Sequence, residues 1–213
     1  PPGHDTATPN PRPEGTHRNP TLAAPAVPLS IMYGCSSQEQ TDDLPPAEMD
    51  AHTQQARAAV KAFFGDLKGE LVAAIKTGGP AHAVSVCNIR AGEIAKRVSL
   101  EQGMDIGRVS LRNRNPGNAA SGWTKDALDR FEAEKAAGKD PKSLVYSTVV
   151  ASADGNEFRY MKAIPTGEVC LNCHGADIAP GVQAKLDALY PGDKATGYSV
   201  GDLRGAFVVT KKL

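Results

Sequence analysis

The stretch Cys170-Leu171-Asn172-Cys173-His174 has the C-x-x-C-H form to which haem is attached covalently. The spacing suits that chemistry, because two thiols separated by two residues can add to the two vinyl groups of one porphyrin. The histidine beside the second thiol can then lie under the iron as its first axial ligand. The motif therefore predicts one covalent haem c, with thioethers at Cys170 and Cys173 and with His174 on the iron.

Two other chemistries use a pair of cysteines at this spacing. A structural zinc site usually takes four ligands, often from two such pairs, whereas the remaining cysteines, Cys35 and Cys87, are single. A thioredoxin-type pair is expected to open a helix after a hydrophobic strand, whereas Pro165 and Gly167 precede this pair. Haem c is the reading that the motif favours.

The bulk composition excludes several classes of partner. The 213 residues contain 24 basic and 24 acidic side chains, so the formal net charge is zero. This balance gives no reason to expect a nucleic acid or an acidic membrane surface as partner. No run of apolar residues is long enough for a membrane-spanning helix. Because haem c is attached outside the cytoplasm, we expect an exported protein, in the periplasm or at the cell surface.

Residues 1–46 differ from the rest, since they hold ten of the 16 prolines. Such a segment cannot sustain a helix and lacks donors for a central strand, which predicts an extended arm or linker. The mildly apolar stretch 21–34 ends at Cys35, as in a lipoprotein signal, so Cys35 is a candidate lipid anchor. We also consider that this arm docks onto a neighbouring copy and supports self-assembly. Residues 47–213 are expected to form the haem domain.

The order of elements predicts an α+β fold. An apolar stripe runs from Met49 to Ile75, Gly78-Gly79 interrupts it, and a second helix is expected from Pro80 to about Glu101. A strand at 106–111, a loop at 112–118 and a helix at 124–137 capped by Thr124 should follow. Strands at 144–151 and 157–164 flank a turn at Asp154-Gly155, and a helix at 182–189 and a strand at 204–210 complete the domain.

Four separated blocks give the chain a family resemblance. They are VCNIRAGEIAKRVS at 86–99, IGRVSLRNRNPGNAASGW at 106–123, CLNCHG at 170–175 and LYPGDKATGYSVGDLRGAFVV at 189–209. In these blocks, over about residues 47–211, the chain resembles the single-haem, PAS-like family of bacterial c-type haem domains. The resemblance implies long helices packed on a PAS-like antiparallel sheet. It also implies electron transfer or sensing rather than catalysis.

The sixth ligand of the iron is left open by the residues alone. The candidates are a water molecule, no ligand, or one of several side chains: Cys87, His52, His82, Met104, Met161 and the histidines of the arm. Cys87 lies on an apolar stripe with Ala83 and Ala91, where a buried free cysteine would also fit. The resemblance points to Cys87, because some relatives use the matching cysteine as an axial ligand. We expect His52 and His82 to be surface or packing residues and Met104 to be exposed.

Three arginines near the predicted loop are candidate contacts of the haem propionates. Arg108, Arg112 and Arg114 precede Trp123, and guanidinium groups bind carboxylates through two parallel hydrogen bonds. A solvated basic turn would explain them equally well. Tyr198, Asp202 and Arg204, in the block after the motif, are candidates for the haem edge or for an ordinary turn.

Three functions are compatible with these observations. The first is electron transfer with a redox partner protein, and the second is a redox or gas sensor that acts through a partner. A peroxidase is the third, but the sequence offers no identifiable distal base. We favour electron transfer, because no output domain follows the last predicted strand in this sequence.

Overall fold

The computed structural model describes residues 44–213, which form an α+β domain, as the sequence predicts. Cys35 and most of the predicted arm lie outside the described residues. The helices are α1 (Pro46–Gln102), α2 (Trp123–Ala136), α3 (Leu171–His174) and α4 (Pro180–Leu189). The strands are β1 (Asp105–Val109), β2 (Val145–Ser152), β3 (Gly155–Pro165) and β4 (Leu203–Lys212). Three 3-10 turns complete the domain: η1 (Pro116–Asn118), η2 (Pro141–Ser143) and η3 (Glu168–Cys170).

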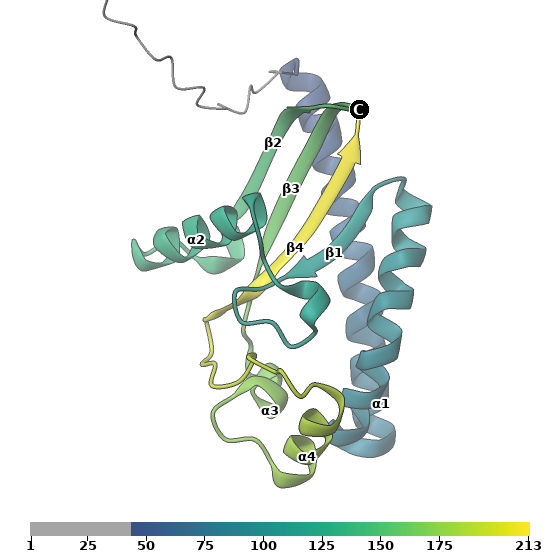
Figure 1. Cartoon of the computed structure of the whole chain (residues 1–213), viewed down its shortest axis with the longest axis vertical. Helices are drawn as coiled ribbons and strands as arrows, with labels where there is room; N and C mark the ends of the chain where they lie inside the picture. The colour runs from purple at the N-terminus through teal and green to yellow at the C-terminus, as the bar shows by residue number, and fades with distance from the viewer. Residues whose placement is uncertain (1–43) are drawn as a thin grey trace, which may run out of the picture. The chain divides into compact units, whose positions relative to one another are not determined.

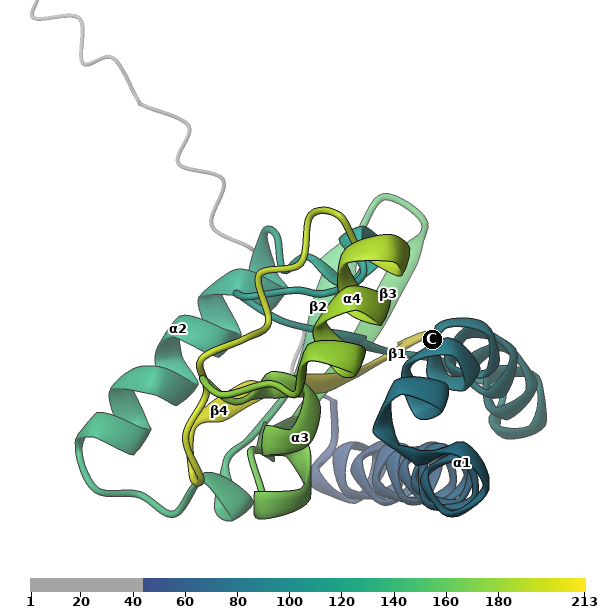
Figure 2. The ribbon, with the colours of Figure 1, turned by 90° about the horizontal axis from the view of Figure 1, so that it is seen from below.

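The 57-residue element α1 is two helices joined at a sharp break. Pro46 occupies the first turn, where proline is tolerated. Gly79 has φ of 76°, a conformation that glycine adopts without a steric penalty, and Pro80 begins the second half. Gly103 ends it in the left-handed conformation, at φ of 60°. The break predicted from Gly78-Gly79 is therefore confirmed, and Figures 1 and 2 show the two halves of α1 lying side by side.

The four strands form one antiparallel sheet in the order β1-β4-β3-β2. β2 and β3 form a hairpin in which Ser152 pairs with Gly155. β4, the last strand of the described chain, lies between β1 and β3, so it bonds to strands from both earlier parts of the domain. The connection from β3 to β4 spans residues 166–202 and contains the C-x-x-C-H motif.

The sheet is covered on both faces (Figure 2). Side chains of β3 alternate between the two sides, as a strand requires. Phe158 and Tyr160 pack in one buried cluster with Phe63 of α1. Met161 and Ala163 belong to a second cluster, which contains Phe131 of α2. The two halves of α1 cover the first face and α2 covers the second. The sequence predicted all of these helices.

Three local predictions were wrong in detail. Met104, expected to be exposed, is 3% exposed and belongs to the core beneath α1. Thr124 does not cap α2, because Gly122 holds the cap position and the Thr124 hydroxyl bonds back to Ser121. The hairpin turn is formed by Ala153 and Asp154, one position earlier than expected, because Gly155 already pairs in β3.

The connection between β3 and β4 lies below the sheet, beside the bend of α1 (Figure 1). There α3 and α4 contact the middle of α1. Val84 of α1 forms a small buried cluster with Val182 and Leu186 of α4. Within residues 44–213 no helix combines the length and apolarity that a membrane crossing requires.

Candidate haem-binding site

The C-x-x-C-H motif spans η3 and α3, immediately after β3. Cys170 ends η3, and Cys173 and His174 end α3. Both thiols are free and partly exposed. The Cys173 side chain packs against the apolar cluster that joins α1 to α4. The short helix therefore places the second thiol against the cluster that contains Val84 of α1.

The orientation of His174 is fixed by a backbone carbonyl. Nδ1 of His174 lies 2.7 Å from the carbonyl oxygen of Ala195. A carbonyl oxygen can only accept, so Nδ1 carries the proton and Nε2 keeps its lone pair. Burial, reinforced by the charges of Arg204 and Arg114, lowers the pKa of His174 to about 2. The ring is therefore neutral, which is the form that binds a metal.

The backbone of the motif is bonded to the segment that carries Ala195. The amide of Tyr198 donates to the carbonyl of His174 at 2.9 Å, and that of Gly197 donates to Gly175 at 2.8 Å. Together with the ring contact, these bonds hold the histidine from both its main chain and its side chain. The two sequence blocks at 170–175 and 189–209 thus form one unit.

Arg114 ties a third block to this unit. Its Nε donates to Oδ2 of Asp193 at 2.9 Å, and its Nη2 donates to the carbonyl of Cys173. The other oxygen of Asp193 accepts the amide of Ala195 at 2.8 Å. Arg114 and Asp193 are only 12% and 11% exposed. Arg114 therefore holds both the motif and the residue that orients His174.

The guanidinium of Arg112 contacts main-chain carbonyls, whereas that of Arg114 also contacts the carboxylate of Asp193. The Arg112 guanidinium donates to the carbonyls of Lys194 and Thr196 and lies 4.2 Å from the ring centre of Tyr198. The buried Tyr198 ring in turn meets the His174 ring edge-on, with centres 6.3 Å apart. Arg112 thus supports the wall behind the histidine.

Arg204 and Arg108 lie in the same neighbourhood. Nε of Arg204 is 3.2 Å and 3.4 Å from the two ring nitrogens of His174. Because Nδ1 already carries a proton, only Nε2 can accept from Arg204. Arg108 extends from β1 over the ring of Phe63, 5.8 Å from its centre. Burial lowers the pKa of both guanidinium groups.

Cys87 lies in the second half of α1, partly buried and unpaired. Burial raises the pKa of the Cys87 thiol, while the nearby charge of Arg108 acts to lower it. The pKa of Cys173 is raised by burial, lowered by the charge of Arg114 and raised by Cys87. The two thiols therefore lie close enough for the charge of one to affect the other. The fold therefore brings the predicted sixth ligand near the motif.

The other candidates for the sixth position lie in different surroundings. Met104 and Met161 are buried in the two core clusters of the sheet. His52 packs on Phe158, with ring centres 5.5 Å apart, and His82 is exposed on α1. The prediction that both histidines are surface or packing residues agrees with these positions.

The two rival readings of the cysteine pair gain no support. Within residues 44–213 no three His, Cys, Asp or Glu side chains are grouped to hold a metal ion, so a zinc site lacks its ligands there. The pair does open a short helix, as in thioredoxin-type proteins, but the 3-10 turn η3, and not a hydrophobic strand, leads directly into that helix. The donor set fits a haem: two thiols, a neutral imidazole whose Nε2 faces Arg204 at 3.4 Å and would exchange that contact for the iron, and a further thiol from α1.

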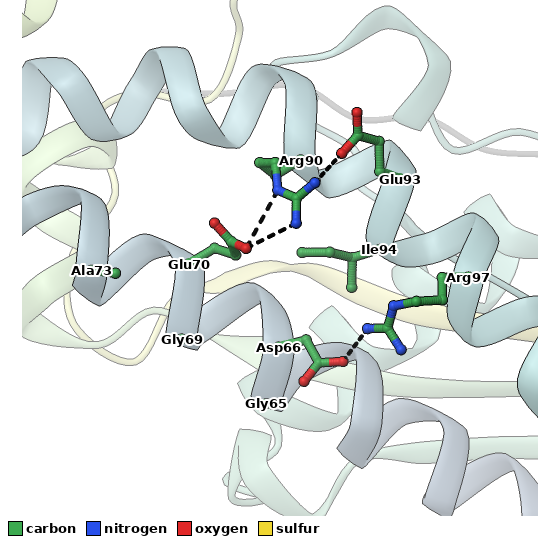
Figure 3. A pocket seen from close by; sticks show the side chains of 9 residues that line it. All are labelled: Gly65, Asp66, Gly69, Glu70, Ala73, Arg90, Glu93, Ile94 and Arg97. Atoms are coloured by element: carbon green, nitrogen blue, oxygen red, sulfur yellow. Dashed lines mark hydrogen bonds and ion pairs between the residues drawn. The ribbon is translucent and has the colours of Figure 1, made fainter.

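A separate hollow of about 540 Å³ lies between the two halves of α1 (Figure 3). It is bordered by two interhelical ion pairs, Arg90–Glu70 at 3.0 Å and Arg97–Asp66 at 2.5 Å. None of the predicted site residues lines it. These bridges join the second half of α1, which carries Cys87, to the first half.

Comparisons with known proteins agree with the geometry. The model of the Tll0287-like family matches residues 36–211. Among solved structures, the chain is similar to the one titled "Crystal structure of the cyanobacterial heme-protein Tll0287". The two are 25% identical with a TM-score of 0.54, and the match covers 79% of this chain and 97% of that one. No curated protein matches the chain. Because the family model spans most of its length, the chain belongs to the Tll0287-like family.

Proposed function

We propose that this protein binds one haem c covalently and transfers electrons outside the cytoplasm. The observation that carries the proposal is the hydrogen bond between Nδ1 of His174 and the carbonyl of Ala195, at 2.7 Å. It orients a neutral imidazole next to two thiols at haem c spacing. Membership of the Tll0287-like family, and similarity to a cyanobacterial heme-protein, support haem as the cofactor.

The roles of the residues follow from their positions. Cys170 and Cys173 form the thioethers, His174 supplies one axial ligand through Nε2, and Cys87 supplies the other from α1. A bound haem would supply reversible one-electron chemistry at the iron. Arg114 and Asp193 hold the loop that orients the histidine, so the ligand set is fixed with little movement between oxidation states.

Electron transfer is preferred over sensing because both axial positions have an assigned side chain. A carrier with two protein ligands should leave no open site for a gas, whereas a gas sensor needs a ligand that is displaced. The optical spectrum of the reduced protein with and without carbon monoxide distinguishes the two. A spectrum that ignores the gas supports a carrier, and a shifted one supports the alternative, a haem-based sensor that acts through a partner.

Covalent attachment is tested by denaturing mass spectrometry on protein made with a haem-maturation system. The expected mass is that of the chain plus one haem. The matched control replaces Cys170→Ala and Cys173→Ala together and should give the bare chain. A wild-type mass without haem would overturn the proposal.

Export follows from the place where haem c is attached, so we propose a periplasmic or cell-surface protein with a redox partner there. Lipid attachment at Cys35 and docking of residues 1–46 onto a neighbouring copy are further proposals that concern residues outside those described. Deleting residues 1–42 tests the docking. Native particles of unchanged size and shape would rule it out.

A further inference from the structure

Two partly buried arginines in the candidate site, Arg108 and Arg204, have no carboxylate partner among residues 44–213. Nη1 of Arg204 contacts only Ser110 Oγ at 3.2 Å and the carbonyl of Arg112 at 3.3 Å, and its Nε faces His174. Arg108 lies over the ring of Phe63 and forms no ion pair with a described residue. Both are thus held in place by neutral groups.

Within residues 44–213, no Asp or Glu is among the groups that most strongly affect the charge of either guanidinium group. The groups whose charge affects Arg204 are Tyr198 and two further arginines, Arg114 and Arg108. Those that affect Arg108 are Cys87 and Tyr190. Three arginines therefore share one partly buried region in which Asp193 balances only Arg114.

Elsewhere in the described chain, three arginines of α1 and α2 are paired even at the surface. Arg90, Arg97 and Arg130 each contact a carboxylate while about half exposed. Burying a charge without a counter-ion costs far more than leaving it in water. The two guanidinium groups without a carboxylate partner therefore favour an anionic ligand.

We propose that Arg108 and Arg204 bind the two propionate carboxylates of the haem. This assignment rests on the proposed function, because the haem supplies the two negative charges. Guanidinium forks match carboxylates in two-point fashion, and pairing would remove the cost of both buried cations. Arg108 lies on β1 and Arg204 is the second residue of β4, and these two strands pair with each other. Two neighbouring strands of the sheet would thus hold both carboxylates.

The proposal divides the arginines of the site into two pairs. Arg112 and Arg114 are occupied by carbonyls and by Asp193, so they brace the loop. Of the three propionate contacts that the sequence suggested, only Arg108 keeps that role. Arg204 binds the second propionate carboxylate.

The test compares full-length, haem-loaded variants by resonance Raman spectroscopy and redox titration. The Arg108→Met and Arg204→Met variants should each shift a propionate bending band to lower frequency, because a hydrogen-bonded carboxylate loses its donor. Each should also lower the midpoint potential, because removal of a cation disfavours the added electron. Arg108→Lys and Arg204→Lys keep the charge and should retain potentials near that of the wild type.

Arg112→Met is the matched control, since its guanidinium lies in the same region but contacts carbonyls. Unchanged propionate bands in both Arg108→Met and Arg204→Met, or an equal shift in Arg112→Met, would refute the assignment. A Met variant that yields no haem-loaded protein while its Lys variant does would support it, because charge is the difference between them. A wild-type chain without haem would instead count against the proposed function.

Discussion

Asp193 accepts a hydrogen bond from the Ala195 amide at 2.8 Å, and the carbonyl of Ala195 in turn receives the proton of His174 Nδ1. The carboxylate that holds this loop is itself held by Arg114. The orientation of the predicted axial histidine thus depends on an ion pair that does not touch the ring. Such outer contacts commonly fix both the tautomer and the direction of a metal-binding histidine.

Asp193→Asn should destabilise the haem-loaded protein by about 3 kcal/mol, because it leaves the mostly buried Arg114 without its counter-ion. Urea unfolding measures the change. Asp129→Asn, which removes an exposed pair with Lys125, is the control and should have little effect. Equal unfolding midpoints for Asp193→Asn and wild type would show that the pair does not support the loop.

Replacing Cys87→Ala should abolish a low-spin thiolate signal in the electron paramagnetic resonance spectrum of the ferric protein. The neutral methyl group offers the iron no ligand, so carbon monoxide should also bind to the reduced variant. His82→Gln, an exposed change five residues earlier on α1, is the control. A spectrum identical to that of the wild type in Cys87→Ala would exclude this ligand.

The haem-free chain, made as Cys170→Ala with Cys173→Ala, should lose stability as the pH falls. The pKa of His174 is about 2 in the folded chain and near its ordinary value when unfolded, so only the unfolded state takes up a proton between those values. The loss should be on the order of 2 kcal/mol between about pH 7 and about pH 5. Adding His174→Gln should remove this component, as measured by urea titrations at both pH values. The same pH slope with and without His174 would contradict the low pKa.

Gly205→Ala should destabilise the protein by at least about 2 kcal/mol. Gly205 has φ of +148°, and an added Cβ would lie 2.2 Å from the carbonyl oxygen of Val109. Gly107→Ala is the control in the same strand pair, because its nearest contact would be Val208 at 3.8 Å. Thermal unfolding compares the two. Similar losses in both variants would mean that the close approach at Gly205 is relieved at little cost.

The sequence predicts the class of fold and the order of its elements because local signals mark them. Gly78-Gly79 and Pro80 identify the break in α1, and alternating apolar residues identify β2 and β3. Met104 was misplaced because a position after a helix-ending glycine is usually exposed, whereas here the chain turns directly under α1. The PAS-like character of the sheet remains a prediction.

For the site, the motif itself names Cys170, Cys173 and His174, since its chemistry depends on local spacing. The roles of the arginines could not be separated in this way. Arg112 and Arg114 look like Arg108 in the sequence, and only their distant partners, Thr196 and Asp193, show that they are occupied. Asp193 itself carried no signal of this role, because its ion-pair partner Arg114 lies 79 residues away in the chain.

The central place of β4 in the sheet has a consequence for the order of assembly. β1 and the β2–β3 hairpin are not bonded to each other until β4 enters between them. The residues of β4 follow the two motif cysteines in the chain, so a growing polypeptide presents these thiols before its sheet can close. An enzyme that attached haem at this stage would act on a chain whose sheet is incomplete. The final strand would then complete the sheet after the cofactor is attached.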